Sequence, residues 1–470
     1  MFDLDFGLSF LLIICLLCAC GFEFINGFHD TANAVATVIY THSLKPRIAV
    51  IWSGIWNFIG VYFGGIAVAM GIVNLLPVEA LVDANMSHGI AMIMALIFTA
   101  IIWNLGTWYF GIPVSSSHTL IGSIFGVGLA YMFLPGSTGV ALNWHKVEEV
   151  GISLLVSPFF GFFVAMLLMI VLKKIVKNKT IFKKPPTSKA PPFWIRSIMV
   201  LSCTAVSFSH GSNDGQKGVG LVMMILIGIV PGYFALDASK NPAALYSNLN
   251  VIENTLSNID TLSLNKEQAV NYVVLQTKID TLQQILQNKQ AFNQIPKEIH
   301  FEIRRDILLI SKSTEKFITS INDNNQILTE EKIKQIKQQI SSIKSHTEFA
   351  PWWVILMISL SLGLGTMIGW KRIVMTIGEK IGKTPMTYAQ GATSQIIAAS
   401  TISASSVLGL PVSTTHVLSS GIAGTMVAED GLKNLQGKTI KNIGLAWLVT
   451  LPVTIVLSGC LFLFLRWILG

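Results

Sequence analysis

Charged residues are scarce in this 470-residue chain, at 12% of the sequence against 52% for hydrophobic residues, and the mean hydropathy is +0.60. Soluble domains carry about 25% charged residues, so this composition excludes a soluble globular protein. Apolar runs long enough to cross a hydrocarbon core of about 30 Å as helices, roughly 20 residues each, recur along the chain. The sequence therefore predicts an all-α polytopic membrane protein. We expect ten segments, at 8–41, 48–73, 89–110, 113–133, 151–172, 197–235, 352–370, 387–409, 411–428 and 443–469.

We expect neither a cleavable leader nor a cysteine-based metal site. The start, MFDLDFGLSF, has an acidic rather than a basic n-region and no small-residue cleavage site, which favours a membrane span over a removable signal peptide. All of the five cysteines lie in apolar segments, and nothing near the first three supplies further metal ligands. We therefore expect packing cysteines, no bound metal and no tightly bound cofactor.

The few loop cations are unevenly distributed. One set of loops holds 17 Lys and Arg residues, namely 41–47, 173–196, 371–386 and 429–442. The amino terminus and the other two loops, 74–88 and 134–150, hold one, Lys146. By the positive-inside rule the first set is cytoplasmic. The stretch 173–196 is then a basic cytoplasmic linker between two halves, and both termini lie on the periplasmic or extracellular side.

A polar stretch at 236–350 interrupts the apolar pattern and contains 13 cations and 13 acids. Its segments QTKIDTLQQILQNKQ and EEKIKQIKQQISSIK carry apolar residues at three- and four-residue spacing, which predicts amphipathic helices. We expect an extramembrane insert on the side of the termini. A periplasmic helical domain, a dimer contact and a poorly ordered loop all remain open.

Five charged residues fall within the apolar segments: Glu23, Asp30, Asp214, Lys217 and Arg466. Arg466 is near enough to a helix end to reach the interface. The other four lie in or beside two similar stretches, FINGFHDTANAVATVIYT and FSHGSNDGQKGVGLV. Such residues cost roughly 2.5–3.5 kcal/mol each at bilayer depth and usually face an ion or substrate path. The alternative is a buried ion pair that only joins two helices.

The two stretches begin matching halves. Aligned, they place His29-Asp30 opposite Asn213-Asp214, and each is followed by a second shared motif, GIPVSSSHTLIGSIFG at 111–126 and GLPVSTTHVLSSGIAG at 409–424. The spacing from acid to proline agrees once the polar insert is removed. Because the first half starts outside and the second starts from the cytoplasmic linker, the sequence predicts two inverted-topology repeats with broken helices and two re-entrant hairpins. The repeats are 1–172, and 197–235 with 351–470.

The prolines of the second motif predict a break from which a half-helix begins, because proline suits a first turn and disfavours helix in the residue before it. Three hydroxyl side chains follow each proline: Ser115, Ser116 and Ser117, and Ser413, Thr414 and Thr415. Free backbone N–H groups and hydroxyls approaching from two sides would suit a tetrahedral oxyanion. The alternative is that these residues only cap or join helices.

With these motifs the chain resembles the inorganic phosphate transporter (PiT) family, and within it the bacterial low-affinity Pit-type permeases. The family pattern resembling G-x-N-D-x-x-N is matched by Gly27–Asn33 and Gly211–Lys217, together with the paired P-V-S-[ST]-[ST]-H hairpins. The resemblance covers about 8–235 and 351–470. It implies phosphate uptake driven by an ion gradient, about twelve membrane segments, a homodimer in the bacterial inner membrane, and no nucleic-acid partner. The implied phosphate ligands are Asp30, Asn33, Ser115, Ser116, Ser117, Asp214, Ser413, Thr414 and Thr415.

Charge balance bears on the coupling ion. A site containing two aspartates cannot accept a doubly negative phosphate in a low-dielectric cavity unless cations accompany it. Lys217 supplies one fixed charge where the sodium-coupled family pattern has Asn. A co-transported proton, or a divalent metal carried with phosphate as a neutral complex, would supply the rest. We assign coupling or charge compensation to His29, Glu23, Asn213 and Lys217, and hairpin support or a secondary role to His118, His416 and His210.

Several alternatives remain. The coupling ion could be sodium. The substrate could be another tetrahedral oxyanion such as sulfate, because hydroxyl donors and helix ends do not distinguish oxyanions by their protonation state. The repeat symmetry and the buried acids favour alternating access over a channel. A membrane enzyme would need a nucleophile or ligand set beyond His29-Asp30 or His210-Asp214, and none is found, so we expect a transporter rather than an enzyme.

Overall fold

A computed structural model describes residues 2–76, 86–134, 142–186, 190–259, 264–325 and 328–469. The chain divides into two compact units. The membrane unit comprises Phe6–Ile225 and Ala350–Gly470, and the insert unit comprises Met1–Asp5 and Leu226–Phe349. Each unit is described here by itself.

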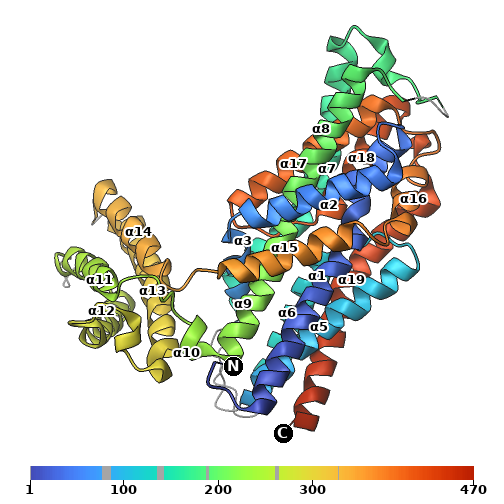
Figure 1. Ribbon diagram of the computed structural model, residues 1–470. Coiled ribbons are helices and arrows are strands. Elements are labelled where there is room, and N and C mark those ends of the chain that lie inside the picture. Colours follow the sequence, from blue (N-terminus) through green and yellow to red (C-terminus); the bar gives the residue numbers. More distant parts are fainter. Residues whose placement is uncertain are drawn as a thin grey trace. The chain divides into compact units, whose positions relative to one another are not determined.

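The described part of the membrane unit consists of helices and their connections, with one isolated bridge between Gly382 and Leu435 (Figure 1). The helices of its first half are α1 (Phe6–Tyr40), α2 (Pro46–Phe63), α3 (Ala67–Val73), α5 (Met86–Tyr109), α6 (Ser116–Met132) and α7 (Trp144–Ile175). Those that follow the linker are α8 (Phe193–His210), the π-helical turn η2 (Gly211–Gly215), α9 (Gln216–Ile229), α15 (Trp352–Thr366), α16 (Lys371–Glu379), α17 (Tyr388–Val407), α18 (Thr414–Asp430) and α19 (Gly437–Leu469).

Four described helices are long and apolar enough to cross a membrane, namely α1, α5, α7 and α19. The expected single span at 48–73 is wrong in detail, because α2 and α3 are bent by 72° at the break between them. Counting this pair as one broken span gives five. The other expected segments fold as shorter or more polar helices, and 197–235 is divided by the π-helical turn at the second acidic motif.

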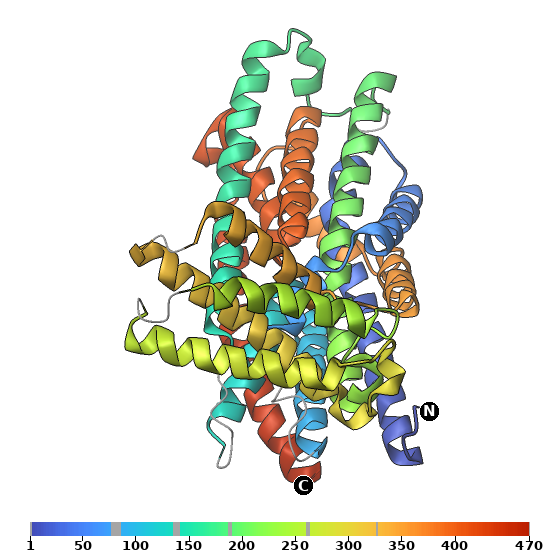
Figure 2. The ribbon, with the colours of Figure 1, turned by 90° about the vertical axis from the view of Figure 1, so that its left-hand side faces the viewer.

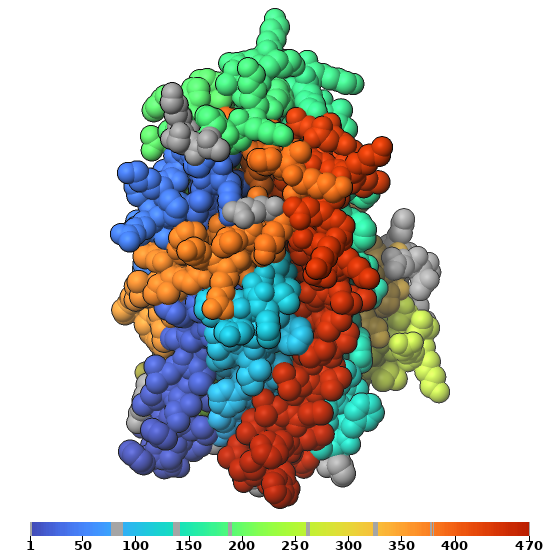
Figure 3. Space-filling view, turned by 90° about the vertical axis from the view of Figure 1, so that its right-hand side faces the viewer, coloured from blue at the N-terminus to red at the C-terminus, as the bar shows by residue number. Residues whose placement is uncertain are grey.

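Helices of the two halves pack on each other in matched pairs. α1 packs on α15 while α2 packs on α8, and α6 packs on α19 while α18 packs on α7. On one face α5 lies between α1 and α19 (Figure 3). The helices of one half thus find their packing partners in the other half.

The closest approaches in these pairs are also matched. A Cβ atom on Gly60 would lie 2.2 Å from the Phe208 carbonyl oxygen, and one on Gly365 would lie 2.1 Å from the Phe24 carbonyl oxygen. Only glycine permits such backbone contact. Phe24 and Phe208 occupy equivalent positions in the alignment of the two acidic motifs. The helices carrying those motifs are therefore held by the same kind of contact in both halves.

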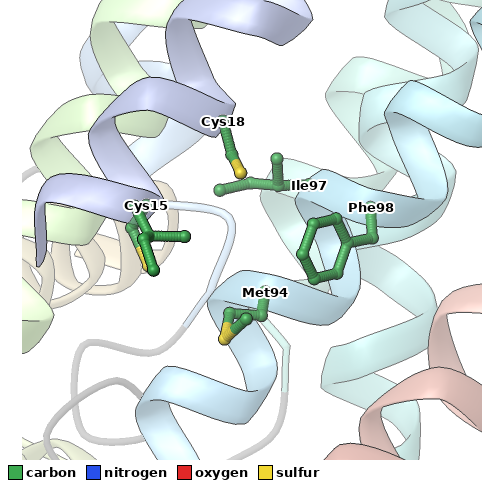
Figure 4. A pocket seen from close by; sticks show the side chains of 6 residues that line it. Cys15, Cys18, Met94, Ile97 and Phe98 are labelled. Atoms are coloured by element: carbon green, nitrogen blue, oxygen red, sulfur yellow. The ribbon is translucent and has the colours of Figure 1, made fainter. Parts of the chain in front are cut away.

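The cysteines of α1 lie in apolar surroundings. Figure 4 shows Cys15 and Cys18 beside Met94, Ile97 and Phe98 of α5, where they line a small hollow without polar side chains. All five cysteines are free thiols. This environment is typical of cysteines that fill space between helices.

The insert unit is built from four main helices, α11 (Pro242–Ser257), α12 (Lys266–Leu286), α13 (His300–Asn325) and α14 (Glu330–Lys344), with a short α10 (Pro231–Phe234) before them. α11 and α12 lie side by side, as do α12 and α13 (Figure 2). Their shared core is almost entirely Leu, Ile and Phe. The chain enters and leaves at one place, because the Asp237 N–H donates to the His346 carbonyl at 2.8 Å.

Candidate functional site

Four charged residues of the membrane unit lie together in one buried region. Glu23, Asp30, Asp214 and Lys217 are all at most 2% exposed. Asp30 lies within α1, and Asp214 lies in the π-helical turn η2. Single π-type turns are frequent at functional sites because they re-aim side chains within a helix.

Both hairpin motifs form a helix end, a short extended segment and a new helix start. α5 ends at Tyr109, and the Ile112 N–H donates to the Thr107 carbonyl at 3.0 Å, while Gly111 has a φ of 67° that favours glycine. The second motif has the same arrangement, because the Leu410 N–H donates a hydrogen bond to the Ser405 carbonyl at 2.9 Å. The new helices begin at Ser116 and Thr414, so the prolines lie before the helix rather than in its first turn.

Two of the six predicted hydroxyls serve as helix caps. The Ser115 and Ser413 oxygens each accept a hydrogen bond from a backbone N–H, of His118 and His416 respectively, at 3.1 Å. This satisfies a donor that the first turn would otherwise leave free. For Ser115 and Ser413 the geometry agrees with the alternative that the motif hydroxyls cap helices.

The next hydroxyl in each motif binds the acid of its own half. The Ser116 hydroxyl donates to Asp30 Oδ2 at 2.9 Å, and the Thr414 hydroxyl donates to Asp214 Oδ2 at 3.2 Å. The two hairpins thus reach the two acids in the same way. Hydrogen bonds to a charged acceptor are about twice as strong as neutral ones.

The third hydroxyl in each motif crosses to the other half. Thr415 donates to Asp30 Oδ1 at 2.6 Å and accepts from Asn33 Nδ2 at 3.0 Å. In the other half, Lys217 and Ser117 are the counterparts of Asn33 and Thr415. Lys217 Nζ donates to the Ser117 hydroxyl, which in turn donates to the Val412 carbonyl at 2.7 Å. The hairpins and acidic motifs of both halves therefore form one polar network.

His210 joins the two acids, a more central place than its predicted secondary role. Its Nε2 lies 3.2 Å from Asp214 Oδ2 and 3.9 Å from Asp30 Oδ2, and its Nδ1 lies 2.8 Å from Asn57 Oδ1. The ligand atoms of His210 and the two aspartates lie within 4.8 Å of one another, so this group could hold a metal ion. Asn57 was not predicted. Its only signal in the sequence is an amide inside the otherwise apolar segment IWNFIG.

Other predicted residues lie around this network. His29 is at 3.4 Å from both Asp30 Oδ1 and the Thr107 hydroxyl. The Asn213 amide donates to the Ser406 hydroxyl and to the Leu410 carbonyl at 3.1 and 3.2 Å, so it supports the second hairpin.

The two motif histidines pack against each other. The His118 and His416 ring centroids are 4.5 Å apart, and His416 stacks on Trp447 with centroids 3.9 Å apart. The Trp447 N–H donates to the Pro113 carbonyl at 3.3 Å. These rings therefore connect the starts of both half-helices with α19, a bracing arrangement.

Comparison with known proteins identifies the family. The model of the phosphate transporter family matches residues 26–458. The low-affinity inorganic phosphate transporter of Buchnera aphidicola subsp. Acyrthosiphon pisum (strain APS) is 43% identical over 493 residues, covering 99% of this chain and 97% of that relative. The low-affinity inorganic phosphate transporter PitA of Escherichia coli (strain K12) is 40% identical over 494 residues, covering 98% and 97%.

A solved structure named the sodium-dependent phosphate transporter shares the fold. Its TM-score is 0.56 at 20% identity, and the match covers 97% of this chain and 99% of that one. The likeness is therefore one of architecture over the full length. The family model and these two relatives show that this chain belongs to the phosphate transporter family and is a membrane transporter rather than an enzyme.

Proposed function

We propose that this protein imports inorganic phosphate by proton symport with alternating access. The observation that carries the proposal is the single buried network in which Asp30 accepts hydrogen bonds from hydroxyls of both hairpins and Asp214 accepts one from the second hairpin. Phosphate, a tetrahedral oxyanion, can accept from the same hydroxyl, amide and ammonium donors. The proposed ligands are Asp30, Asn33, Ser116, Ser117, Asp214, Thr414 and Thr415, with Ser115 and Ser413 shaping the helix starts.

The fixed charges favour a proton over sodium as the coupling ion. Two carboxylates and a phosphate would be strongly repulsive without compensating cations. Lys217 contacts Asp214 and Ser117, and so supplies a positive charge within the network itself. A divalent metal travelling with phosphate would supply further charge, and Asp30, His210 and Asp214 offer it ligands.

In the proposed arrangement the two halves are inverted-topology repeats that move against each other around this network. The matched helix pairs and matched hairpins support this reading. The linker 173–196 lies on the cytoplasmic side of the bacterial inner membrane, and the termini and the insert lie on the periplasmic side. The protein assembles as a homodimer, as the family resemblance implies.

Transport by purified protein in proteoliposomes tests the proposal. Proton and sodium gradients are imposed separately, with and without a divalent metal, and labelled phosphate uptake is followed. A proton gradient alone should drive accumulation, and a large excess of sulfate should not compete. Accumulation driven by sodium alone would establish sodium symport instead, and effective competition by sulfate would broaden the substrate to other oxyanions.

A further inference from the structure

Glu23 is a buried acid that the phosphate network does not use. It lies on α1 about two turns before Asp30 and is fully buried. Its Oε2 accepts a hydrogen bond from Asn26 Nδ2 at 3.1 Å. Its Oε1 and the Asn26 Oδ1 are both buried, and neither has a hydrogen-bond partner among the described residues. Glu23 therefore has a single weak partner, whereas Asp30 has several.

Lys217, a cation that acts on Glu23 electrostatically, makes its hydrogen bonds to other groups. Lys217 Nζ donates to Asp214, to the Ser117 hydroxyl and to the Val412 carbonyl. An ammonium group has three N–H donors, so none is left for Glu23. Within the described chain no Lys, Arg or His forms an ion pair with the Glu23 carboxyl.

The carboxyl also lies directly against the second half of the molecule. A Cβ atom on Gly218, the residue after Lys217, would lie 2.3 Å from Glu23 Cγ and 2.6 Å from its Oε1. The ionisable groups that act on Glu23 electrostatically are Cys20 on α1, His210, Asp214 and Lys217. Movement of one half against the other would therefore change the surroundings of this carboxyl directly.

From this geometry we propose that Glu23 carries the transported proton. A buried carboxylate without a counter-ion is strongly disfavoured, and a proton is the cation that neutralises it without needing further ligands. In the closed arrangement Glu23 holds the proton, and exposure to the cytoplasmic side lets the O–H bond ionise and the proton pass to water. The assignment rests on the proposed proton symport and identifies its coupling residue as Glu23 rather than His29.

Asn26 is suited to serve both protonation states. Its amide nitrogen donates to the carboxylate form, and a half-turn of the amide would present its oxygen to the O–H of the acid form. No second ionisable group is needed for this exchange. Asn26 is therefore a positioning residue for the proton.

The test separates phosphate movement from proton movement. In proteoliposomes, Glu23→Gln should retain exchange of internal for external phosphate but lose accumulation driven by a proton gradient, together with phosphate-dependent proton uptake reported by an internal pH dye. Glu149→Gln, which changes an acid at the partly exposed start of α7, is the matched control and should retain all three activities.

Each outcome decides a different claim. If wild type is not driven by a proton gradient, the proposed proton symport is wrong. If wild type is driven and Glu23→Gln is driven equally, the symport stands and the assignment to Glu23 is wrong. Should Glu23→Gln fail to insert, Glu23→Asp still decides, because it keeps an acid and should accumulate phosphate with an altered pH dependence. An unaltered pH dependence in that variant would overturn the assignment.

Discussion

Among the described residues, the membrane unit and the insert unit each contain one fully buried Lys or Arg, and these two cations have different partners. Lys217 in the membrane unit donates to Asp214, to the Ser117 hydroxyl and to the Val412 carbonyl. Arg304 in the insert unit donates to two backbone carbonyls, of Ala235 at 3.3 Å and of Thr347. Burial lowers the pKa of Arg304 to about 10, with partial compensation by Glu348. Arg304 holds together the two chain segments that enter and leave the insert, whereas Lys217 joins side chains of the two repeated motifs.

The two units also differ in which kinds of side chain they bury and expose. The insert unit buries Leu, Ile and Phe and keeps ion pairs such as Lys344–Glu315 at its surface. The membrane unit exposes large apolar side chains such as Phe163 and Leu448 and buries its hydroxyls, amides and acids. A membrane solvates the first pattern poorly and the second well. We infer that buried charge marks function in the membrane unit and stability in the insert.

Replacing either aspartate of the buried network should have the largest effect on phosphate uptake. Asp30→Asn and Asp214→Asn each delete a charge and place an amide N–H₂ among groups that already donate to that position. Hydrogen bonds to a charged group are worth about 1.5–3 kcal/mol each, so concentrative phosphate uptake should fall by at least about a hundredfold. Uptake is measured against the amount of correctly inserted protein.

Asp280→Asn is the matched control for the acids. Asp280 is exposed on α12 of the insert, so its loss should leave uptake unchanged. Normal uptake by Asp30→Asn or Asp214→Asn would show that the proposed two-acid site is wrong. The contrast drawn here between the two units would then be wrong as well.

The sequence predicts much of this region, because the acids, the hydroxyls and their order along the chain are all visible as repeated motifs. It does not predict which hydroxyl does what. Ser115 and Ser413 differ from their neighbours only by their place at the N-cap, which depends on where the helix starts. The Val412 carbonyl and Asn57 enter through tertiary packing, which no local pattern encodes.

The fold was predictable to the same extent. Apolar length identified the long helices α1, α5, α7 and α19. Apolar length alone does not show the 72° bend between α2 and α3, which lies at Gly64-Gly65, where Gly65 has a φ of 83°. The hydrophobic periodicity and composition of a segment indicate which residues are buried. They do not indicate in which direction the chain continues after a break, because that depends on contacts with distant parts of the sequence.

The hydroxyls of the hairpins should have the next largest effect. Ser116→Ala and Thr414→Ala each remove one donor that reaches an aspartate while keeping the backbone of the helix start. Apparent phosphate affinity should fall by roughly ten- to a hundredfold for each. The double variant should lose more than either. Affinity is obtained from the concentration dependence of labelled phosphate uptake.

Ser123→Ala is the control within the same helix. Its hydroxyl is buried like that of Ser116 but donates only to the Thr119 carbonyl at 2.7 Å. Affinity should stay at the wild-type value. If Ser116→Ala and Thr414→Ala behave like this control, the hydroxyls are structural and the two-hairpin site must be abandoned.

Deleting most of the insert should affect transport less than the substitutions of the two aspartates and the two hairpin hydroxyls. Replacing 240–346 by a short flexible linker removes α11 to α14 together with His346. The linker has little distance to span, because the Asp237 N–H donates to the His346 carbonyl in the intact chain. The insert has its own apolar core, so we expect the membrane unit to fold without it. Transport should remain measurable in proteoliposomes. Loss of insertion or folding would show that the insert is needed by the membrane unit.

The smallest expected effect is a pH dependence of the insert's stability. Burial lowers the pKa of His346, whose Nδ1 lies 3.1 Å from the Ser342 carbonyl and whose Nε2 has no hydrogen-bond partner among the described residues. The unfolded chain therefore binds a proton more readily than the folded insert, so stability is complete above about pH 6.5 and declines below it. His346→Gln should reduce the decline between about pH 7.5 and pH 5.5, as measured by hydrogen exchange in α14. An unchanged decline would assign the pH dependence to other groups, and phosphate uptake by this variant should match wild type throughout.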